Sequence, residues 1–137
     1  MRHIAFRAKV KLDIPVLGLP EEITEGKWVY GDLHFRCKYP HIHLAQPRGC
    51  KAPIDIETLG QDTGLRDKNG RVVWEGDIVR YRSSDERYTK NPRFKILPIR
   101  YDESSARFMA GNIYWQNLSS SKIEVIGNIY DNPELLR

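Results

Sequence analysis

The chain has 137 residues, of which 40% are hydrophobic and 29% charged, and it carries a net charge of +4 at pH 7. This is the length and composition of one globular domain, so a disordered chain is excluded. No apolar run approaches the roughly 18 residues that span a bilayer and no signal-peptide core is visible, so we expect a cytoplasmic protein with no membrane partner.

The first half of the chain alternates between strand patterns and breaks. Residues 3–12 alternate between apolar and polar positions, which predicts a half-buried strand. Proline and glycine interrupt 13–26, so we expect a loop there. Aromatic and β-branched residues over 28–37 predict a strand or hairpin with a bend at Gly31. Four prolines and glycines in 39–53 predict an exposed connection at an edge.

The middle of the chain is rich in turn signals. An extended pattern over 54–59 leads into 60–70, where three glycines and the Asn69-Gly70 pair predict turns. Short strands are expected on either side of a bend at Glu75-Gly76. The polar stretch 83–92 is expected to be a long loop.

The last third continues with short strands. Residues 94–101 alternate around Pro98, which predicts an edge strand, and 107–115 predict a hairpin with its turn at Gly111-Asn112. The clearest strand pattern covers 122–130, and 132–136 predict a short C-terminal helix with proline in its first turn. Together these elements predict a mainly β fold (all-β or α+β): a meandering antiparallel sheet or a partly open small barrel.

Glycines and aspartates in this pattern are expected to shape the backbone. Glycine tolerates positive φ, and a short acidic side chain accepts hydrogen bonds from nearby amides. We therefore predict these structural turn residues: Gly60, Gly64, Asp67, Asn69, Gly70, Gly76, Asp77 and Gly127. The glycines of 60–70 do not indicate a phosphate-binding loop, because the stretch lacks the Gly-Lys-Ser/Thr ending of such loops.

Three blocks of this sequence stand out: 58–70 (TLGQDTGLRDKNG), 74–79 (WEGDIV) and 123–136 (IEVIGNIYDNPELL). In order and spacing they resemble the signatures of the YopX family, with weaker similarity at 6–8 and 29–33. The resemblance implies a β-rich fold, a gene carried by phages, prophages or related mobile elements, and a homo-oligomer, but no established activity. Asp62 stands where the family commonly has an aromatic residue, and 13–26 and 38–53 follow no family pattern.

We predict one domain over residues 1–137. Within it, 1–53 form a variable N-terminal part and 54–137 a motif-bearing β core, because the family blocks are concentrated in the second part.

Soft metal ligands are concentrated in one region of the chain: His34, Cys37, His41, His43 and Cys50. Their spacing matches no standard Cys/His zinc pattern, so we predict no metal site and regard a metal-dependent enzyme as an outlying alternative. In a reducing compartment the two cysteines are expected to be free thiols.

The sequence shows no recognisable set of catalytic residues. Asp62, Asp67 and Asp77 lie in one acidic region, but each is expected to serve its own turn. No Ser, Cys or Thr has the context of an activated nucleophile. We therefore expect no catalytic residue, no cofactor and a protein that is not an enzyme.

The clearest positive signal is a stretch in which cations alternate with aromatic residues. Single-stranded nucleic acid suits such a stretch, because phosphates pair with the charges while bases stack on the rings. Candidate contacts are Arg80, Tyr81, Arg82, Arg87, Tyr88, Lys90, Arg93 and Lys95. An ordinary solvated basic face is the competing interpretation, because Asp85 and Glu86 dilute the charge.

Two functional hypotheses result. The first is a non-catalytic, oligomeric accessory protein of a mobile element that binds itself or an unknown protein partner. The alternative is a nucleic-acid-binding module that uses the stretch 80–95.

Overall fold

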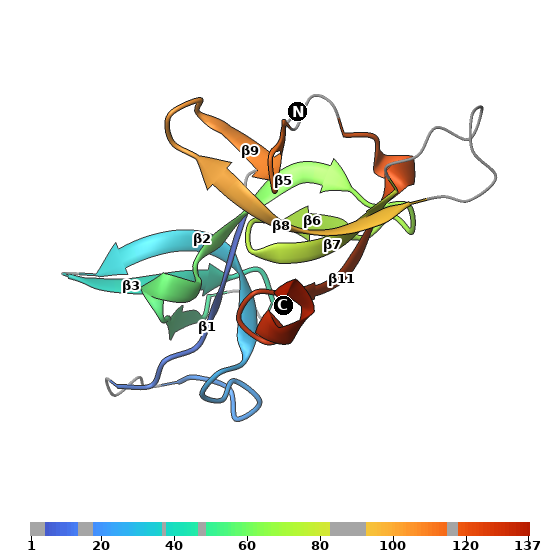
Figure 1. The fold of residues 1–137 in the computed structure, drawn as a ribbon. Coiled ribbons are helices and arrows are strands. Elements are labelled where there is room, and N and C mark those ends of the chain that lie inside the picture. The colour runs from blue at the N-terminus through green and yellow to red at the C-terminus, as the bar shows by residue number, and fades with distance from the viewer. Residues whose placement is uncertain (1–4, 14–17, 37, 47–48, 83–92, 115–117) are drawn as a thin grey trace. The chain divides into compact units, whose positions relative to one another are not determined.

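A computed structural model describes residues 5–13, 18–36, 38–46, 49–82, 93–114 and 118–137 (Figure 1). The chain forms two compact units, Met1–Asp62 and Thr63–Arg137. The mainly β fold is confirmed, since every strand pair with a defined register is antiparallel and the described helices are short 3-10 turns. The assignment of 1–137 to a single domain stays a prediction.

The first unit is a meander of four antiparallel strands that the start of a fifth extends. The strands are β1 (Phe6–Lys9), β2 (Trp28–Arg36), β3 (Tyr39–Leu44) and β4 (Lys51–Pro53), in the order β4-β3-β2-β1, and the first residues of β5 (Gly60–Arg66) pair with β1. The 3-10 turn η1 (Ile56–Thr58) connects β4 to β5.

The prediction of an exposed connection over 39–53 was wrong, because β3 and β4 lie there. Ile42, Leu44 and Ala52 are buried, so this segment contributes to the core. The prolines do not prevent pairing, because Pro40 is the second residue of β3 and Pro53 the last residue of β4, and a missing amide hydrogen is tolerated at strand ends.

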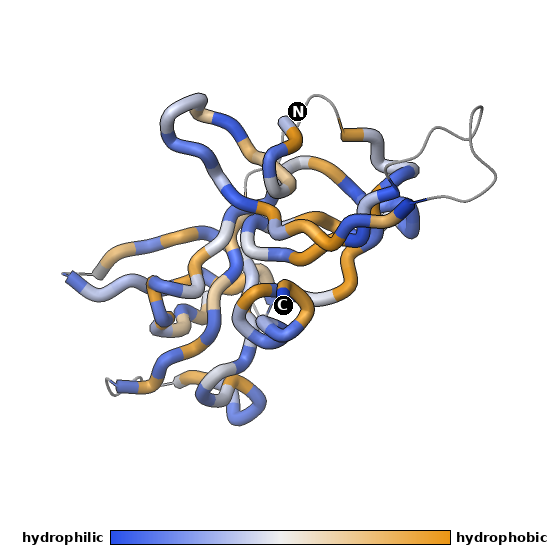
Figure 2. Tube along the Cα trace, in the orientation of Figure 1, coloured by the Kyte–Doolittle hydropathy of each residue, from blue (hydrophilic) through white to orange (hydrophobic). Residues whose placement is uncertain are grey.

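The core of the first unit lies on one face of this sheet. Its buried members are Ala8, Val10, Ile23, Val29, Ile42, Leu44, Ala52 and Ile54. Figure 2 shows how hydrophobic residues recur along the strands. An isolated bridge joins Val10 to Ile54, but no closed barrel is formed by the described residues.

The second unit contains a five-stranded antiparallel sheet. Its order is β10-β9-β8-β7-β11, with β7 (Asp77–Arg82), β8 (Phe94–Asp102), β9 (Arg107–Ala110), β10 (Ile113–Tyr114) and β11 (Ile123–Asn128). The rest of β5 neighbours β6 (Val72–Trp74), and η3 (Ser120–Lys122) precedes β11. The core of this unit consists of Val73, Val79, Ile99, Ala110, Ile123 and Val125.

Strand β8 lies inside its sheet, which corrects the predicted edge strand. Residues 94–98 pair with β7 and 99–102 pair with β9, so Pro98 stands where the strand changes partner. The Pro98 carbonyl accepts a hydrogen bond from the amide of Gly111 at 2.9 Å. Proline is tolerated here because this hydrogen bond to Gly111 uses the proline carbonyl oxygen and does not require an amide hydrogen.

The expected C-terminal helix is a short 3-10 turn, η4 (Pro133–Leu136), rather than an α-helix. Asn132 precedes it but makes no capping hydrogen bond. Its side-chain oxygen instead accepts a hydrogen bond from the amide of Asn128 at 3.2 Å. Asn132, which predicted the start of a helix, therefore stabilises the turn after β11. Among the described residues, no helix has the length and apolar character needed to cross a membrane.

Candidate functional site

The pairing of β7 with β8 divides the predicted nucleic-acid contacts between two faces of the sheet. Arg82 pairs with Phe94 and Tyr81 pairs with Lys95. Directly paired residues share a face, and neighbours along a strand alternate, so Arg80, Arg82 and Phe94 lie together. Tyr81 packs against the core on the opposite face, which Lys95 shares.

Arg80 is the centre of the first group, which we call the Arg80 face: Arg80, Arg82, Phe94, Ile96 and Glu124. The Arg80 guanidinium carbon lies 4.9 Å from the centroid of the Phe94 ring, within the range of a cation–π contact. Its Nη2 donates to Oε2 of Glu124 at 2.7 Å. Phe94 is 52% exposed, so a large part of its ring surface is open to solvent.

Lys68 reaches the same carboxylate from a turn far away in sequence. Its Nζ lies 3.3 Å from Oε2 of Glu124, and the Lys68 amide donates to the carbonyl of Ile123. The hydrogen bond from Lys68 is the main cause that lowers the pKa of Glu124. Desolvation raises this pKa, but the charge of Lys68 and the hydrogen bond and charge of Arg80 also lower it, so the net shift is downward. Glu124 is therefore an anion held between two cations.

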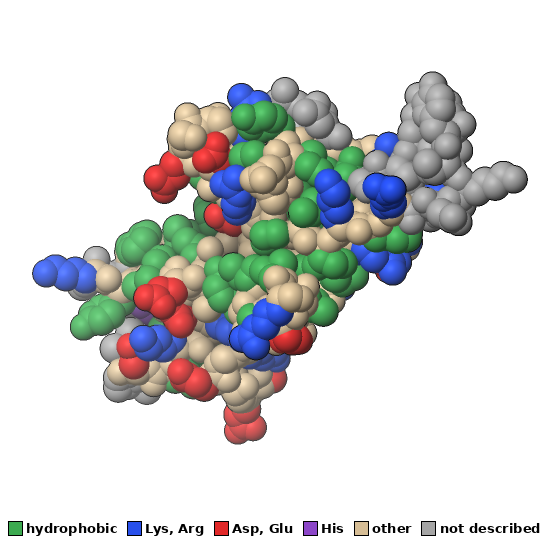
Figure 3. Space-filling model, viewed as in Figure 1, with side chains coloured by type: hydrophobic (Ala, Val, Ile, Leu, Met, Phe, Trp, Pro, Cys, Tyr) green, Lys and Arg blue, Asp and Glu red, His purple; other side chains and the backbone are tan. Residues whose placement is uncertain are grey.

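The other predicted contacts lie apart from this face or outside the described residues. Arg93 is exposed just before β8. Arg87, Tyr88 and Lys90 fall outside the described residues. Sequence reasoning missed Lys68 and Glu124, because only the pairing of β11 with β7 and the packing of the 67–71 turn bring them to Arg80. Figure 3 shows Lys and Arg side chains near the start of β8.

Asp67 joins that turn to β11. Its Oδ1 accepts the amides of Asn69 and Arg71, each at 2.9 Å, and Oδ2 accepts the amide of Val125 at 3.0 Å. Burial by itself raises the pKa of Asp67, but the three amide hydrogen bonds and the charge of Arg71 outweigh it, so the pKa is lowered. Asp67 is thus a buried, ionised structural residue.

The second predicted turn aspartate also bonds to the backbone. Asp77 is buried and its Oδ2 accepts the amide of Trp74 at 2.8 Å, across the bend that contains Gly76. Positive φ angles occur in three of the predicted turn glycines: Gly64, Gly70 and Gly76.

Three predicted turn glycines lie within strands: Gly64, with its positive φ, is in the middle of β5, and Gly60 and Gly127 are also strand residues. Gly60 is the first residue of β5 and pairs with Arg7. Gly127 lies in β11 at a register shift, where an added Cβ would come within 2.6 Å of Oδ1 of Asn132. Its small size is therefore needed for the close approach of the following turn.

The first unit has a pocket of about 290 Å³ beside β3, β4 and η1. Its apolar wall consists of Tyr39, Pro40, Pro53, Ile54 and Ile56, and its charged lining of Lys11, Asp13, Asp55 and Glu57. Tyr39 and Ile56 are exposed large side chains, 52% and 46% respectively. The pocket therefore combines an apolar wall with a surplus of carboxylates.

His34, His41 and His43 lie on one face of β2 and β3. His34 pairs with His41, and the rings of His34 and His43 have centroids 6.3 Å apart. His41 is buried, with Nδ1 3.0 Å from the Tyr39 carbonyl oxygen. In the part of the chain that the structure describes, no three His, Cys, Asp or Glu side chains are placed to hold a metal ion. Cys50 is a free thiol, and Cys37 lies outside the described residues.

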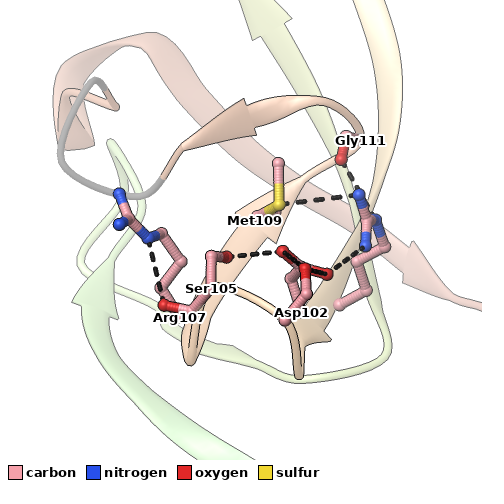
Figure 4. A network of polar contacts seen from close by, with 7 residues as sticks. Asp102, Ser105, Arg107, Met109 and Gly111 are labelled. Carbon is pink, nitrogen blue, oxygen red and sulfur yellow. Dashed lines mark hydrogen bonds and ion pairs between the residues drawn. The ribbon is translucent and has the colours of Figure 1, made fainter.

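A separate polar network lies at the β8–β9 hairpin (Figure 4). The Asp102 carboxylate accepts the hydroxyls of Ser104 and Ser105, and Arg100 donates to the Gly111 carbonyl at 3.1 Å. The hydroxyl of Ser105 is the main cause that lowers the pKa of Asp102. These contacts tie the hairpin together.

These features define a mainly β protein of antiparallel strands joined by 3-10 turns. Residues 22–137 match the family described as YopX protein, so the chain belongs to the YopX family, as its motifs predicted. It is similar in structure to the crystal structure of protein EF1440 from Enterococcus faecalis, with a TM-score of 0.52, 22% identity and full coverage of both chains. This likeness concerns the fold. No curated protein matches the chain.

Proposed function

We propose that this YopX-family protein is a non-catalytic accessory protein of a phage or related mobile element, and that it functions as a homo-oligomeric binding module. Membership of the family supports the origin, and the pocket of the first unit carries the binding part of the proposal. An exposed aromatic ring beside apolar walls is typical of side chains that dominate protein interfaces.

The proposed occupant of this pocket is a second copy of the chain. Three carboxylates and one lysine line the pocket, whereas the whole chain carries +4. Another copy therefore offers the opposite charge, which favours encounter and orientation. Tyr39 and Ile56 would supply the apolar contact.

Sedimentation velocity over a wide concentration range tests this function. We expect the wild-type protein to form a defined oligomer and the Ile56→Asp variant to dissociate, because a carboxylate in the apolar wall opposes burial. Tyr101→Asp is the control, since Tyr101 is also an exposed large hydrophobic side chain but belongs to the second unit. A wild-type protein that stays monomeric throughout would refute the assembly.

The Arg80 face supports a second candidate function, the binding of single-stranded nucleic acid. The observation in its favour is that Arg80, Arg82 and an exposed Phe94 share one face of β7 and β8. Binding through phosphates should weaken steeply with salt, and reversing the charge of Arg80 and Arg82 together should abolish it. Binding that does not depend on salt, or no binding at low ionic strength, would exclude this function.

A further inference from the structure

Two cations of the second unit converge on a single carboxylate oxygen. Lys68 Nζ and Arg80 Nη2 lie 3.3 Å and 2.7 Å from the same atom, Oε2 of Glu124. The three side chains come from the 67–71 turn, β7 and β11, and they are 45%, 43% and 27% exposed. The folded chain thus builds a solvent-accessible position for an anionic oxygen.

We propose that Lys68 and Arg80 form a phosphate-binding position for single-stranded nucleic acid, and that Glu124 occupies this position in the free protein. The inference rests on the second proposed function and names its central contact. Guanidinium and ammonium groups bind carboxylate and phosphate oxygens through the same charge-assisted hydrogen bonds. A phosphate can therefore replace the Glu124 carboxylate between the two cations.

The exchange costs the fold little because the internal ion pair is exposed. Ion pairs in solvent add little to stability, so giving them up costs the fold little. A phosphodiester group has two free oxygens, so it can accept from both cations at once. Glu124 would then stand beside the bound phosphate as a like charge that opposes binding.

The neighbours of Arg80 favour a nucleic-acid strand over a free phosphate ion. The Phe94 ring lies beside Arg80 and offers an exposed surface on which a base can stack. Arg82 lies two residues further along β7, which places it about 7 Å away on the same face. A second phosphate of the same strand can meet it there.

Fluorescence anisotropy with a labelled oligothymidine of about 20 nucleotides tests the inference on the full chain. We expect Lys68→Gln and Arg80→Gln each to weaken binding by about threefold to tenfold and to reduce the salt slope, by at most about 0.7 because the two cations share one phosphate. The Glu124→Gln variant should bind about threefold more tightly, because a competing charge is removed.

Matched controls separate this position from general basicity. Lys95→Gln removes the same charge from the other face of β8 and should change affinity less than Lys68→Gln. Phe94→Ala should weaken binding by about fivefold or more without changing the salt slope, because stacking releases no counterions. Circular dichroism of each variant checks that the substitution leaves the fold intact.

The possible failures are distinguishable. If the wild-type protein does not bind at low salt, the nucleic-acid function itself is refuted. If it binds but Glu124→Gln is neutral or weaker, or Lys95→Gln equals Lys68→Gln, the function survives and the phosphate position between Lys68 and Arg80 is overturned. A preference for duplex over the single strand, or equal competition by inorganic phosphate, overturns the identity of the ligand.

Discussion

The Asp67 carboxylate accepts the amide of Val125 at 3.0 Å across 58 positions of the chain, and both groups are buried. The other oxygen of the same carboxylate holds the amides of Asn69 and Arg71. One side chain therefore closes a turn and fixes that turn to β11. Lys68, within this turn, is positioned next to Glu124 as a result.

The Asp67→Asn substitution should destabilise the protein by about 2 kcal/mol, the contribution of hydrogen bonds to a charged group. The amide group of asparagine is nearly the same size but places a donor against one of three backbone donors. Urea unfolding measures the loss, and hydrogen exchange at the Val125 amide should accelerate. Glu103→Gln, an exposed carboxylate in the same unit, is the control and should change stability by less than about 0.5 kcal/mol.

Acid should remove the contribution of Asp67. Its pKa in the folded state is lowered below the ordinary value of 3.8, so the unfolded state binds its proton first as the pH falls. The stabilisation is complete above that ordinary value and is lost as the pH falls through the lower folded pKa. The free energy of unfolding, measured by urea denaturation at several pH values between 6 and about 2, should therefore decrease less steeply with falling pH for Asp67→Asn than for wild type. Equal slopes would contradict the assignment.

The Gly31→Ala substitution should cost about 3 kcal/mol, the upper range for forcing an atom into a packed site. An added Cβ would lie 1.9 Å from the carbonyl oxygen of His43, which is backbone and paired in β3. Gly18→Ala is the control, because Gly18 has φ +79 but no atom within 4 Å of the added Cβ. A similar loss in both variants would mean that backbone strain, and not the His43 contact, decides the requirement.

The Gly127→Ala substitution should cost less, about 1 kcal/mol, because the nearest atom belongs to a side chain that can move. The added methyl group would displace Asn132 and break its hydrogen bond to the Asn128 amide. Combining Gly127→Ala with Asn132→Ala should then cost less than the sum of the two single changes. Thermal unfolding of the four proteins measures this coupling, and strict additivity would argue against the contact.

Local patterns in the sequence predicted much of the fold. The alternation over 122–130 predicted β11, and the Asn69-Gly70 pair marked the turn after β5, because both depend on near neighbours in the chain. Proline and glycine were less reliable guides. Pro98 suggested an edge strand, yet β8 is internal because its two halves pair with different neighbours.

The sequence by itself determined that this is a mainly β protein of the YopX family, since period-two patterns, turn residues and family motifs are properties of the chain read in order. Only the tertiary structure decided which charges act together. Strand alternation separated Arg80 from Lys95, and the packing of the Asp67 turn against β11 brought Lys68 to Glu124. Contacts between residues more than fifty positions apart depend on strand pairing, which no local pattern encodes.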